Sequence, residues 1–328
     1  MPEPSAFTHR LVTSSGHRIH LAEAGPTDGD LVVMVHGFPE SWYSWRHQLT
    51  ALGAAGYRAV AIDVRGYGRS ARPAEIESYA MTALVGDVMA VLDDAGVERA
   101  VVVGHDWGAP IAWNTALLRP ERIWGVAGLS VPYNPRGDVP PLEAFRAMMA
   151  EGDLFYIDYF QEPGVAEAEA EADLERWLRG FYFTASGEAD PSQPSMGVVP
   201  HGHQLVERLQ LPAEGQMAWL PDHDFDYYLQ EFLRTGLTGG FNRYRNITRD
   251  WTELAAWRFA PITVPALFIG GDRDGPTQLG RRAIDRFDAT LPALTRSVIL
   301  DGCGHWTQQE RPAEVNELLL EFLAGLAD

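Results

Sequence analysis

Hydrophobic positions in the first 130 residues alternate between short apolar runs and longer stretches with helical spacing. The run Leu31–Val35 is apolar at every position, which is typical of a parallel strand covered on both faces. We predict strands at Arg18–Glu23, Leu31–His36, Arg58–Asp63, Arg99–Val103 and Val126–Ser130, and helices at Trp45–Ala55, Met81–Asp94 and Ala109–Leu118. Strands that alternate with helices predict an α/β fold with a mostly parallel central sheet flanked by helices.

This alternation stops near Pro132, and residues 135–245 contain no comparable apolar strands. We predict helices in this region at Leu142–Ala150, Val165–Phe181 and Asp224–Thr235. After it we predict two further strands and a closing helix, at Pro265–Gly270, Ser297–Asp301 and Pro312–Ala324. The pattern therefore predicts an α/β core formed by residues 1–134 and 246–328, interrupted by a helical cap domain at 135–245. A single α/β domain with one long excursion is the alternative.

One acidic segment inside the predicted cap has a regular pattern. Residues Ala166–Glu171 read Ala-Glu-Ala-Glu-Ala-Glu, and both residue types are strong helix formers. We interpret the glutamates as a solvated helix face rather than as a binding feature.

Composition and charge narrow the function further. The 328 residues, 46% of them hydrophobic, are sufficient for a large core, and the net charge of −19 disfavours nucleic acid and anionic membranes as partners. Cys303 is the one cysteine, which excludes an intramolecular disulfide and a Cys-rich metal site. Although it lies near His305, we interpret it as a small core residue. The first ten residues lack an apolar signal region, and no apolar run approaches membrane-spanning length, so we expect a cytoplasmic protein.

The segment Gly104–Gly108 reads Gly-His-Asp-Trp-Gly and lies between a predicted strand and a predicted helix. A pentapeptide with small residues at both ends forms, in this place, a nucleophile elbow, whose middle side chain stands exposed above the sheet. Here that residue is Asp106. A carboxylate that displaces a leaving group from an sp³ carbon becomes an ester, which can be hydrolysed, whereas a serine would become a stable ether. Asp106 therefore predicts alkyl transfer to water, with an epoxide or alkyl halide as substrate.

Such a nucleophile needs a general base and an acidic residue that orients the base. The predicted strand Ser297–Asp301 is followed by a glycine-rich turn that carries His305, the candidate base. The loop after the preceding strand offers two acids, Asp272 and Asp274. We predict that Asp274 orients His305, because it lies farther into the loop and can reach across, and that Asp272 is a turn residue.

Two backbone N–H groups are predicted to form an oxyanion hole. Trp107 follows the nucleophile and supplies one of them, and Phe38, in the loop after the first buried strand, supplies the other. His105 points away from the base position because side chains diverge at an elbow, and we interpret His36 as bonded to backbone groups. The sequence leaves open whether the peptide bond before Pro39 is cis.

Four core motifs and two cap segments together resemble the soluble epoxide hydrolases of the α/β-hydrolase fold. They are His36-Gly37-Phe38-Pro39, Asp63–Gly68, Gly104–Gly108, Gly304-His305-Trp306, Tyr159–Gly164 and Asn242–Asn246. The resemblance extends over nearly the whole chain. The elbow alone is shared with haloalkane dehalogenases, whereas the cap segments are more specific.

The resemblance implies that two cap tyrosines, at the positions of Tyr156 and Tyr244, hydrogen-bond the epoxide oxygen. Ring opening creates an alkoxide that needs a proton, and tyrosine stays protonated at neutral pH. Tyr159 competes with Tyr156 for this position, and core packing is the alternative for any tyrosine. The chain departs from the family at Arg243, where Trp is frequent, which leaves open whether Arg243 alters the pocket wall or the contact between cap and core.

These residues predict an epoxide hydrolase that forms a 1,2-diol through an ester on Asp106, with no metal or organic cofactor. Phe38 and Trp107 are expected to contact the substrate together with the two tyrosines. We expect a small, neutral, apolar epoxide and water as reactants and no nucleic-acid or membrane partner, and a homodimer stays open. One alternative is a haloalkane dehalogenase with the same nucleophile, although such enzymes often have an Asn donor at the position of Phe38. Another is a weakly catalytic hydrolase-fold receptor for a hydrophobic ligand. The sequence does not indicate the natural epoxide or the selectivity.

Overall fold

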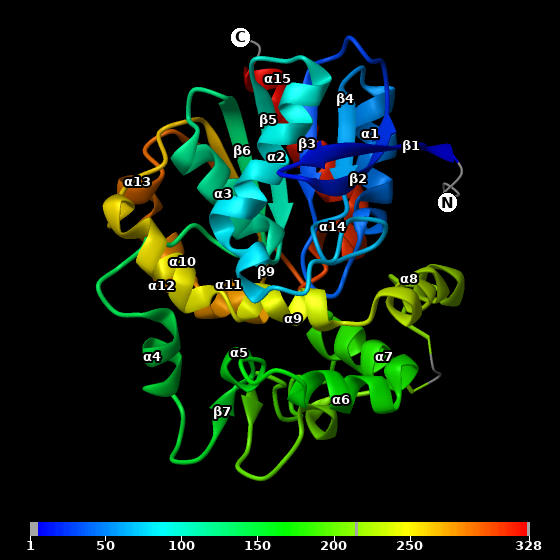
Figure 1. The fold of residues 1–328 in the computed structure, drawn as a ribbon, viewed down its shortest axis with the longest axis vertical. Coiled ribbons are helices and arrows are strands. Elements are labelled where there is room, and N and C mark those ends of the chain that lie inside the picture. The colour runs from blue at the N-terminus through cyan, green and yellow to red at the C-terminus, as the bar shows by residue number, and fades with distance from the viewer. Residues whose placement is uncertain (1–5, 214–215, 327–328) are drawn as a thin grey trace.

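The computed structural model describes residues 6–213 and 216–326. Within these residues the core is an eight-stranded sheet of order β1-β2-β4-β3-β5-β6-β9-β10 (Figure 1). Its strands are β1 Thr8–Ser14, β2 His17–Ala24, β3 Leu31–Val35, β4 Arg58–Ile62, β5 Ala100–His105, β6 Ile123–Leu129, β9 Ala266–Gly271 and β10 Leu294–Leu300. β2 pairs antiparallel with both of its neighbours, and every other pairing is parallel. The predicted α/β fold with a mostly parallel sheet is confirmed.

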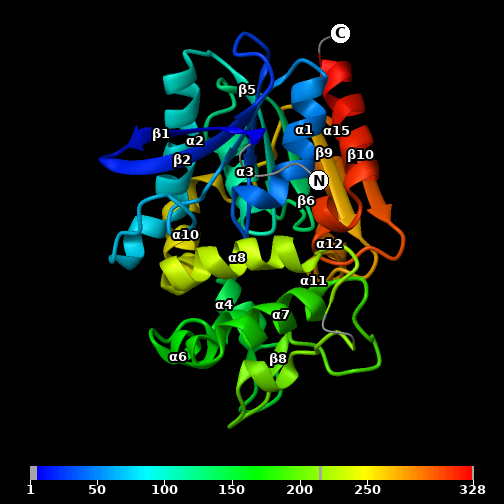
Figure 2. The same ribbon diagram turned by 90° about the vertical axis from the view of Figure 1, so that its right-hand side faces the viewer.

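Helices cover both faces of this sheet. Helices α1 Arg46–Ala54 and α15 Pro312–Leu326 lie on one face, and α2 Met81–Ala95 and α3 Gly108–Leu118 lie on the other (Figure 2). Strands β3 and β5 are consequently buried at every residue, which is why they are apolar without alternation. Because neighbouring parallel strands end at the same edge of the sheet, the loops after β3, β5, β9 and β10 meet there.

The chain between β6 and β9 leaves the sheet at this edge. Helices α4 to α7 lie beyond the carboxyl ends of the strands, with α8 and α9 between them and the sheet (Figures 1 and 2). We call the elements from α4 to α9 the cap. The helices and strands of the cap, followed by the next helix, α10, are α4 Pro141–Arg146, β7 Leu154–Phe155, α5 Tyr156–Tyr159, α6 Val165–Ala172, α7 Leu174–Ala185, β8 Val198–Val199, α8 Asp222–Thr235, α9 Thr238–Tyr244 and α10 Ile247–Glu253.

Short helices complete the described chain. They are α11 Gly275–Leu279, α12 Arg281–Ile284, α13 Phe287–Thr290 and α14 Thr307–Glu310, with the 3₁₀ helices η2 Trp42–Trp45, η3 Ile76–Tyr79, η4 Leu205–Arg208 and η5 Leu254–Trp257.

Some predicted elements have the wrong extent. The single helix predicted at Val165–Phe181 is wrong, because Asp173 separates α6 from α7 and its side chain accepts a hydrogen bond from the Arg176 N–H at 3.1 Å. The helix predicted at Leu142–Ala150 is too long, since α4 ends at Arg146. Strand β1 was not predicted, because it pairs only with β2 and most of its side chains are at least partly exposed.

The prediction of a solvated glutamate face is also wrong. The side chains of Glu167 and Glu169 are buried. Glu169 accepts hydrogen bonds at 2.8–3.1 Å from the Trp177 indole and from the Leu205 and Val206 N–H groups. A two-residue repeat on a helix of 3.6 residues per turn distributes its members around the axis, so successive glutamates cannot share one exposed face.

Candidate active site

Asp106 lies in the turn between β5 and α3, and its φ of 50° is a left-handed conformation that residues other than glycine rarely adopt. Small residues on both sides permit this turn. A Cβ at Gly104 would lie 2.0 Å from the Gly108 carbonyl oxygen, and a Cβ at Gly108 would lie 1.9 Å from the Val35 oxygen. The structure thus forms the sharp turn predicted at this motif, with Asp106 at its apex.

Asp106, His305 and Asp274 lie together at the carboxyl edge of the sheet. His305 Nε2 is 3.4 Å from Asp106 Oδ2, and His305 Nδ1 is 2.8 Å from Asp274 Oδ1. Thr277 holds the second oxygen of Asp274, through its N–H at 3.0 Å and its hydroxyl at 2.6 Å. Asp272 is exposed. Of the two acids in this loop, Asp274 is therefore the one that contacts His305.

Each of these charged groups alters the protonation of the others. Burial alone would raise the pKa of Asp106, but the hydrogen bond and charge of His305, with the charge of His105, bring it below its ordinary value. Burial alone would lower the pKa of His305, but the charge of Asp274 and the bonds to both carboxylates raise it well above its ordinary value. Both shifts favour the ion pair of a protonated His305 with the Asp106 carboxylate.

The loop after β3 binds one oxygen of the nucleophile. The Phe38 N–H donates to Asp106 Oδ1 at 2.7 Å, which leaves Oδ2 on the side of His305. The Phe38–Pro39 peptide bond is cis, the point that the sequence left open. Trp107 follows Asp106 in the chain and is the residue directly before α3. The Phe38 N–H therefore contacts the carboxylate of Asp106, and the Trp107 N–H stays a prediction as the second donor of an oxyanion hole.

Tyr156 and Tyr244 lie side by side in the cap, with ring centroids 6.2 Å apart. The Tyr244 ring packs edge-on against Phe38 and Trp107, at 5.4 and 5.0 Å. Burial raises the pKa of both tyrosines well above the ordinary value, and the nearby charge of Asp106 raises it further. Both phenols consequently stay protonated at neutral pH within electrostatic reach of Asp106.

Two further residues that the sequence singled out are bonded elsewhere. The Tyr159 hydroxyl donates to Glu169 inside the cap, so its proton is already engaged. The ring of His36 is bonded to the backbone groups of Gly37 and Val64, at 2.8 and 2.9 Å, which confirms that prediction. Between the two competing tyrosines, Tyr156 is the one that lies beside Tyr244.

A buried carboxylate that sequence reasoning missed joins three loops of the site. Glu40 is fully buried, accepts a hydrogen bond from the Gly37 N–H at 3.1 Å and lies 2.8 Å from His105 Nδ1. The other ring nitrogen of His105 is 2.7 Å from the carbonyl oxygen of His305. The second oxygen of Glu40 accepts from the side-chain amides of Gln308 and Gln309. Glu40 therefore links the loop of Phe38, the elbow and the loop of His305. The sequence feature that could have indicated this role is its position three residues after Gly37, in the same loop as Phe38.

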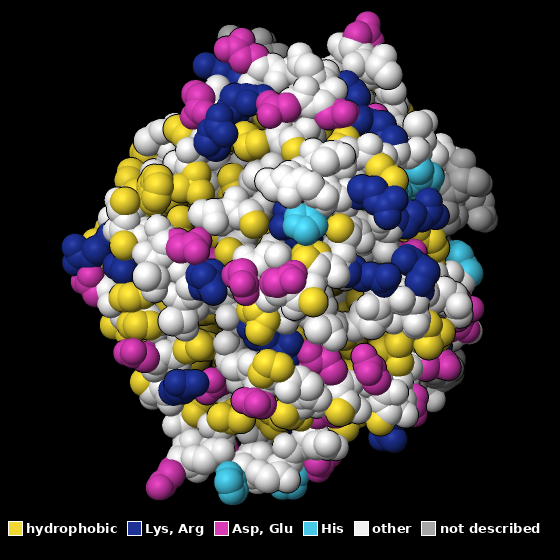
Figure 3. Space-filling view, in the orientation of Figure 1, with side chains coloured by type: hydrophobic (Ala, Val, Ile, Leu, Met, Phe, Trp, Pro, Cys, Tyr) yellow, Lys and Arg dark blue, Asp and Glu magenta, His cyan; other side chains and the backbone are white. Residues whose placement is uncertain are grey.

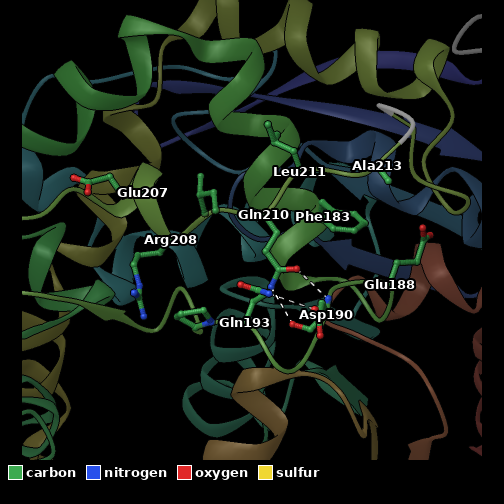
Figure 4. Close-up of a pocket in the computed structure, with 11 residues that line it drawn as sticks. Phe183, Glu188, Asp190, Gln193, Glu207, Arg208, Gln210, Leu211 and Ala213 are labelled. Atoms are coloured by element: carbon green, nitrogen blue, oxygen red, sulfur yellow. Dashed lines mark hydrogen bonds between the residues drawn. The ribbon is translucent and has the colours of Figure 1, made fainter.

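A cavity of about 470 Å³ lies in the cap but contains none of these side chains (Figure 4). Two of its polar lining residues, Gln210 and Asp190, exchange two hydrogen bonds at 3.0 and 3.1 Å. Figure 3 shows both acidic and basic side chains on one face of the molecule, with several basic side chains gathered at the right of the view. Cys303 is fully buried, and burial raises the pKa of its thiol, as expected of a core residue.

Neither a group of metal ligands nor a membrane-spanning helix is found in the part of the chain that the structure describes. Within residues 6–213 and 216–326, no three His, Cys, Asp or Glu side chains are grouped as metal ligands. In the same part of the chain, none of the helices combines the length and the apolar character that crossing a bilayer requires.

Comparison with known proteins shows the family to which the chain belongs. Residues 30–312 match the family described as alpha/beta hydrolase fold. Over 321 residues the chain is 47% identical to Epoxide hydrolase A of Mycobacterium tuberculosis, with 98% of each chain covered. The structure of an epoxide hydrolase from an endophytic Streptomyces is 54% identical, with a TM-score of 0.94 over 98% of this chain and 96% of that one. An epoxide hydrolase from Vigna radiata is 37% identical, with a TM-score of 0.85 over 99% and 100% of the two chains. The chain therefore belongs to the α/β-hydrolase fold family and, within it, to the epoxide hydrolases.

Proposed function

We propose that this protein hydrolyses a small, neutral, apolar epoxide to a 1,2-diol through an ester formed on Asp106. One observation carries the proposal: Asp106 has the His305–Asp274 pair on one side and two protonated cap tyrosines within electrostatic reach. The relatives that are 47% and 54% identical are epoxide hydrolases, which supports the class of reaction. The scheme requires no metal ion or organic cofactor.

Ring opening is the first half of the reaction. Asp106 attacks an epoxide carbon through Oδ2, since Oδ1 is bound by the Phe38 N–H. The carbon–oxygen bond breaks, and its electron pair passes to the epoxide oxygen. Tyr156 and Tyr244 donate hydrogen bonds to this oxygen, and one of them transfers a proton, which avoids an unprotonated alkoxide. The product is a hydroxyalkyl ester of Asp106.

Ester formation prepares the base for the second half. The ester has no negative charge, so the interactions with Asp106 that raise the pKa of His305 are lost. The imidazolium then releases its proton, which passes through solvent to the tyrosinate left by ring opening. His305, oriented by Asp274, then takes a proton from a water molecule that attacks the ester carbonyl carbon. The oxyanion forms on Oδ1 beside the N–H groups of Phe38 and Trp107, where one donor contributes about 3 kcal/mol to the barrier. On collapse the bond between the ester carbon and Oδ2 breaks, the second proton of the water molecule passes to the departing Oδ2, and the diol and the carboxylate of Asp106 are formed.

A single turnover in ¹⁸O-labelled water tests this proposal. With enzyme in excess over styrene oxide, we expect label in the Asp106 peptide by mass spectrometry and none in the diol. Label in the diol, with an unlabelled enzyme, would show that water attacks the epoxide directly. Halide release from a haloalkane, with no diol from any epoxide, would contradict the substrate class, and the absence of any turnover would favour a receptor.

A further inference from the structure

Arg243, next to Tyr244 on α9, is a buried cation at the boundary between cap and core. Only 2% of its surface is exposed. One of its guanidinium nitrogens donates to the carbonyl oxygen of Tyr79, and another pairs with Asp250. The second oxygen of Asp250 accepts from the Met81 N–H, at the start of α2, at 2.7 Å. A chain of charged hydrogen bonds therefore fastens α9 to the core directly beside Tyr244.

The same guanidinium lies over the indole ring of Trp107, 4.7 Å from its centroid. Trp107 directly follows the nucleophile, and its ring also packs edge-on against Tyr244 at 5.0 Å. A planar cation over an indole face is an attractive and orienting contact. Burial lowers the pKa of Arg243 to about 9, which still leaves the group charged at neutral pH. Cation, indole and phenol thus form a continuous series of contacts that ends at the proposed proton donor.

Arg245, on the other side of Tyr244, has the opposite attachment. Its guanidinium pairs with Glu167 at 2.8 Å and donates to the Phe160 carbonyl at 3.1 Å, both inside the cap. The side chains of the two arginines are equally buried, at 3% exposure each. Arg243 is therefore the side chain that ties Tyr244 to the core and the elbow, whereas Arg245 ties it to the cap.

We propose that Arg243 is a positioning residue for ring opening, which holds Tyr244 over Asp106 through the Trp107 indole and presents a fixed positive charge to the developing alkoxide. This inference rests on the proposed function, because it assigns Arg243 to one of its two steps. Ester hydrolysis depends on His305 and the backbone N–H groups, whereas Arg243 contacts the ring of Trp107. Its loss should consequently slow ester formation and leave ester hydrolysis nearly unchanged.

The rates of ester formation and ester hydrolysis can be measured separately by rapid quench of the reaction with styrene oxide. Mass spectrometry then quantifies the ester on Asp106 at each time. For Arg243→Met we expect ester formation to slow about tenfold and ester hydrolysis to change less than about twofold. Arg243→Lys keeps the charge but loses the planar stack, so it should recover part of the rate. The matched control is Arg65→Met, since Arg65 has a comparable buried pair with Asp87 at 2.6 Å and donates to the Ser78 carbonyl at 3.0 Å.

The outcomes separate this inference from the proposed function. If the wild-type enzyme forms no ester, the proposed function fails. If it forms the ester but Arg243→Met slows both steps equally or neither, or if Arg65→Met gives the same selective loss, Arg243 is only structural and the inference fails. If Arg243→Met does not fold, Arg243→Lys must still slow ester formation by a larger factor than ester hydrolysis. Slowing of both steps by the same factor in Arg243→Lys would overturn the inference.

Discussion

Replacing Asp274 by Asn tests the orientation of the base with little change in shape. Asn caps helices as well as Asp does, so the bond to the Thr277 N–H and the start of α11 should persist. The 2.8 Å contact with His305 Nδ1, however, loses its negative charge. A hydrogen bond to a charged group stabilises by about 1.5–3 kcal/mol, and 3 kcal/mol corresponds to about 150-fold in rate. An Asn that also selects the wrong imidazole tautomer would increase the loss to about 10⁴-fold.

Rapid quench with styrene oxide provides the measurement for this substitution. Since His305 acts as a base only in ester hydrolysis, we expect Asp274→Asn to accumulate the ester of Asp106, with hydrolysis slowed at least about 100-fold. Asp272→Asn is the matched control, because it is the same chemical change at an exposed position of the same loop. An inactive Asp272→Asn beside an active Asp274→Asn would refute the assignment.

Three other substitutions test the tyrosines, the charges and the elbow. Tyr244→Phe removes a donor to the alkoxide and should slow ester formation about 10- to 100-fold, whereas Tyr159→Phe should change that rate less than about twofold; equal effects would contradict the assignment. Asp106→Asn removes a charge that raises the pKa of His305, so NMR titration of His305 should give a lower pKa than in the wild type. Protonated His305 stabilises the fold, and this stability is lost as the pH rises through its pKa, so in the variant the loss should begin at a lower pH. An unchanged His305 titration would refute the coupling. Gly108→Ala places a Cβ 1.9 Å from a backbone oxygen and should lower the free energy of unfolding in urea by about 1–3 kcal/mol or prevent folding; a fully stable variant would show that the turn can relax.

Much of the site could be predicted because its residues lie within a few positions of strand ends. Asp106 follows β5, Asp274 follows β9 and His305 follows β10. Parallel strands bring such positions to one edge, so motif and strand order together predict that the three side chains meet. The buried, uninterrupted apolar runs of β3 and β5 made these strands easy to recognise.

The contacts that distinguish similar residues were beyond sequence reasoning. Tyr156 and Tyr159 are three residues apart, hence neighbours on a helix surface, and what separates them is Glu169 on a different helix. The partners of Arg243 belong to η3 and α10, and one of them is a backbone carbonyl, which has no sequence signal. The buried glutamates of α6 show the same limit, because their burial depends on the segments that fold over them.

The bond from the Phe38 N–H to Asp106 makes the two carboxylate oxygens unlike atoms. In the proposed scheme, Oδ2 joins the substrate carbon and departs with the product in every cycle, and a solvent atom takes its place. Oδ1, anchored to the amide, never exchanges. After many turnovers in ¹⁸O-labelled water, the enzyme should therefore carry a single ¹⁸O atom at Asp106. Each product molecule after the first should contain the ¹⁸O atom that Asp106 acquired in the preceding turnover. The Phe38 N–H thus determines which carboxylate oxygen of Asp106 stays in the enzyme and which one is transferred to the product.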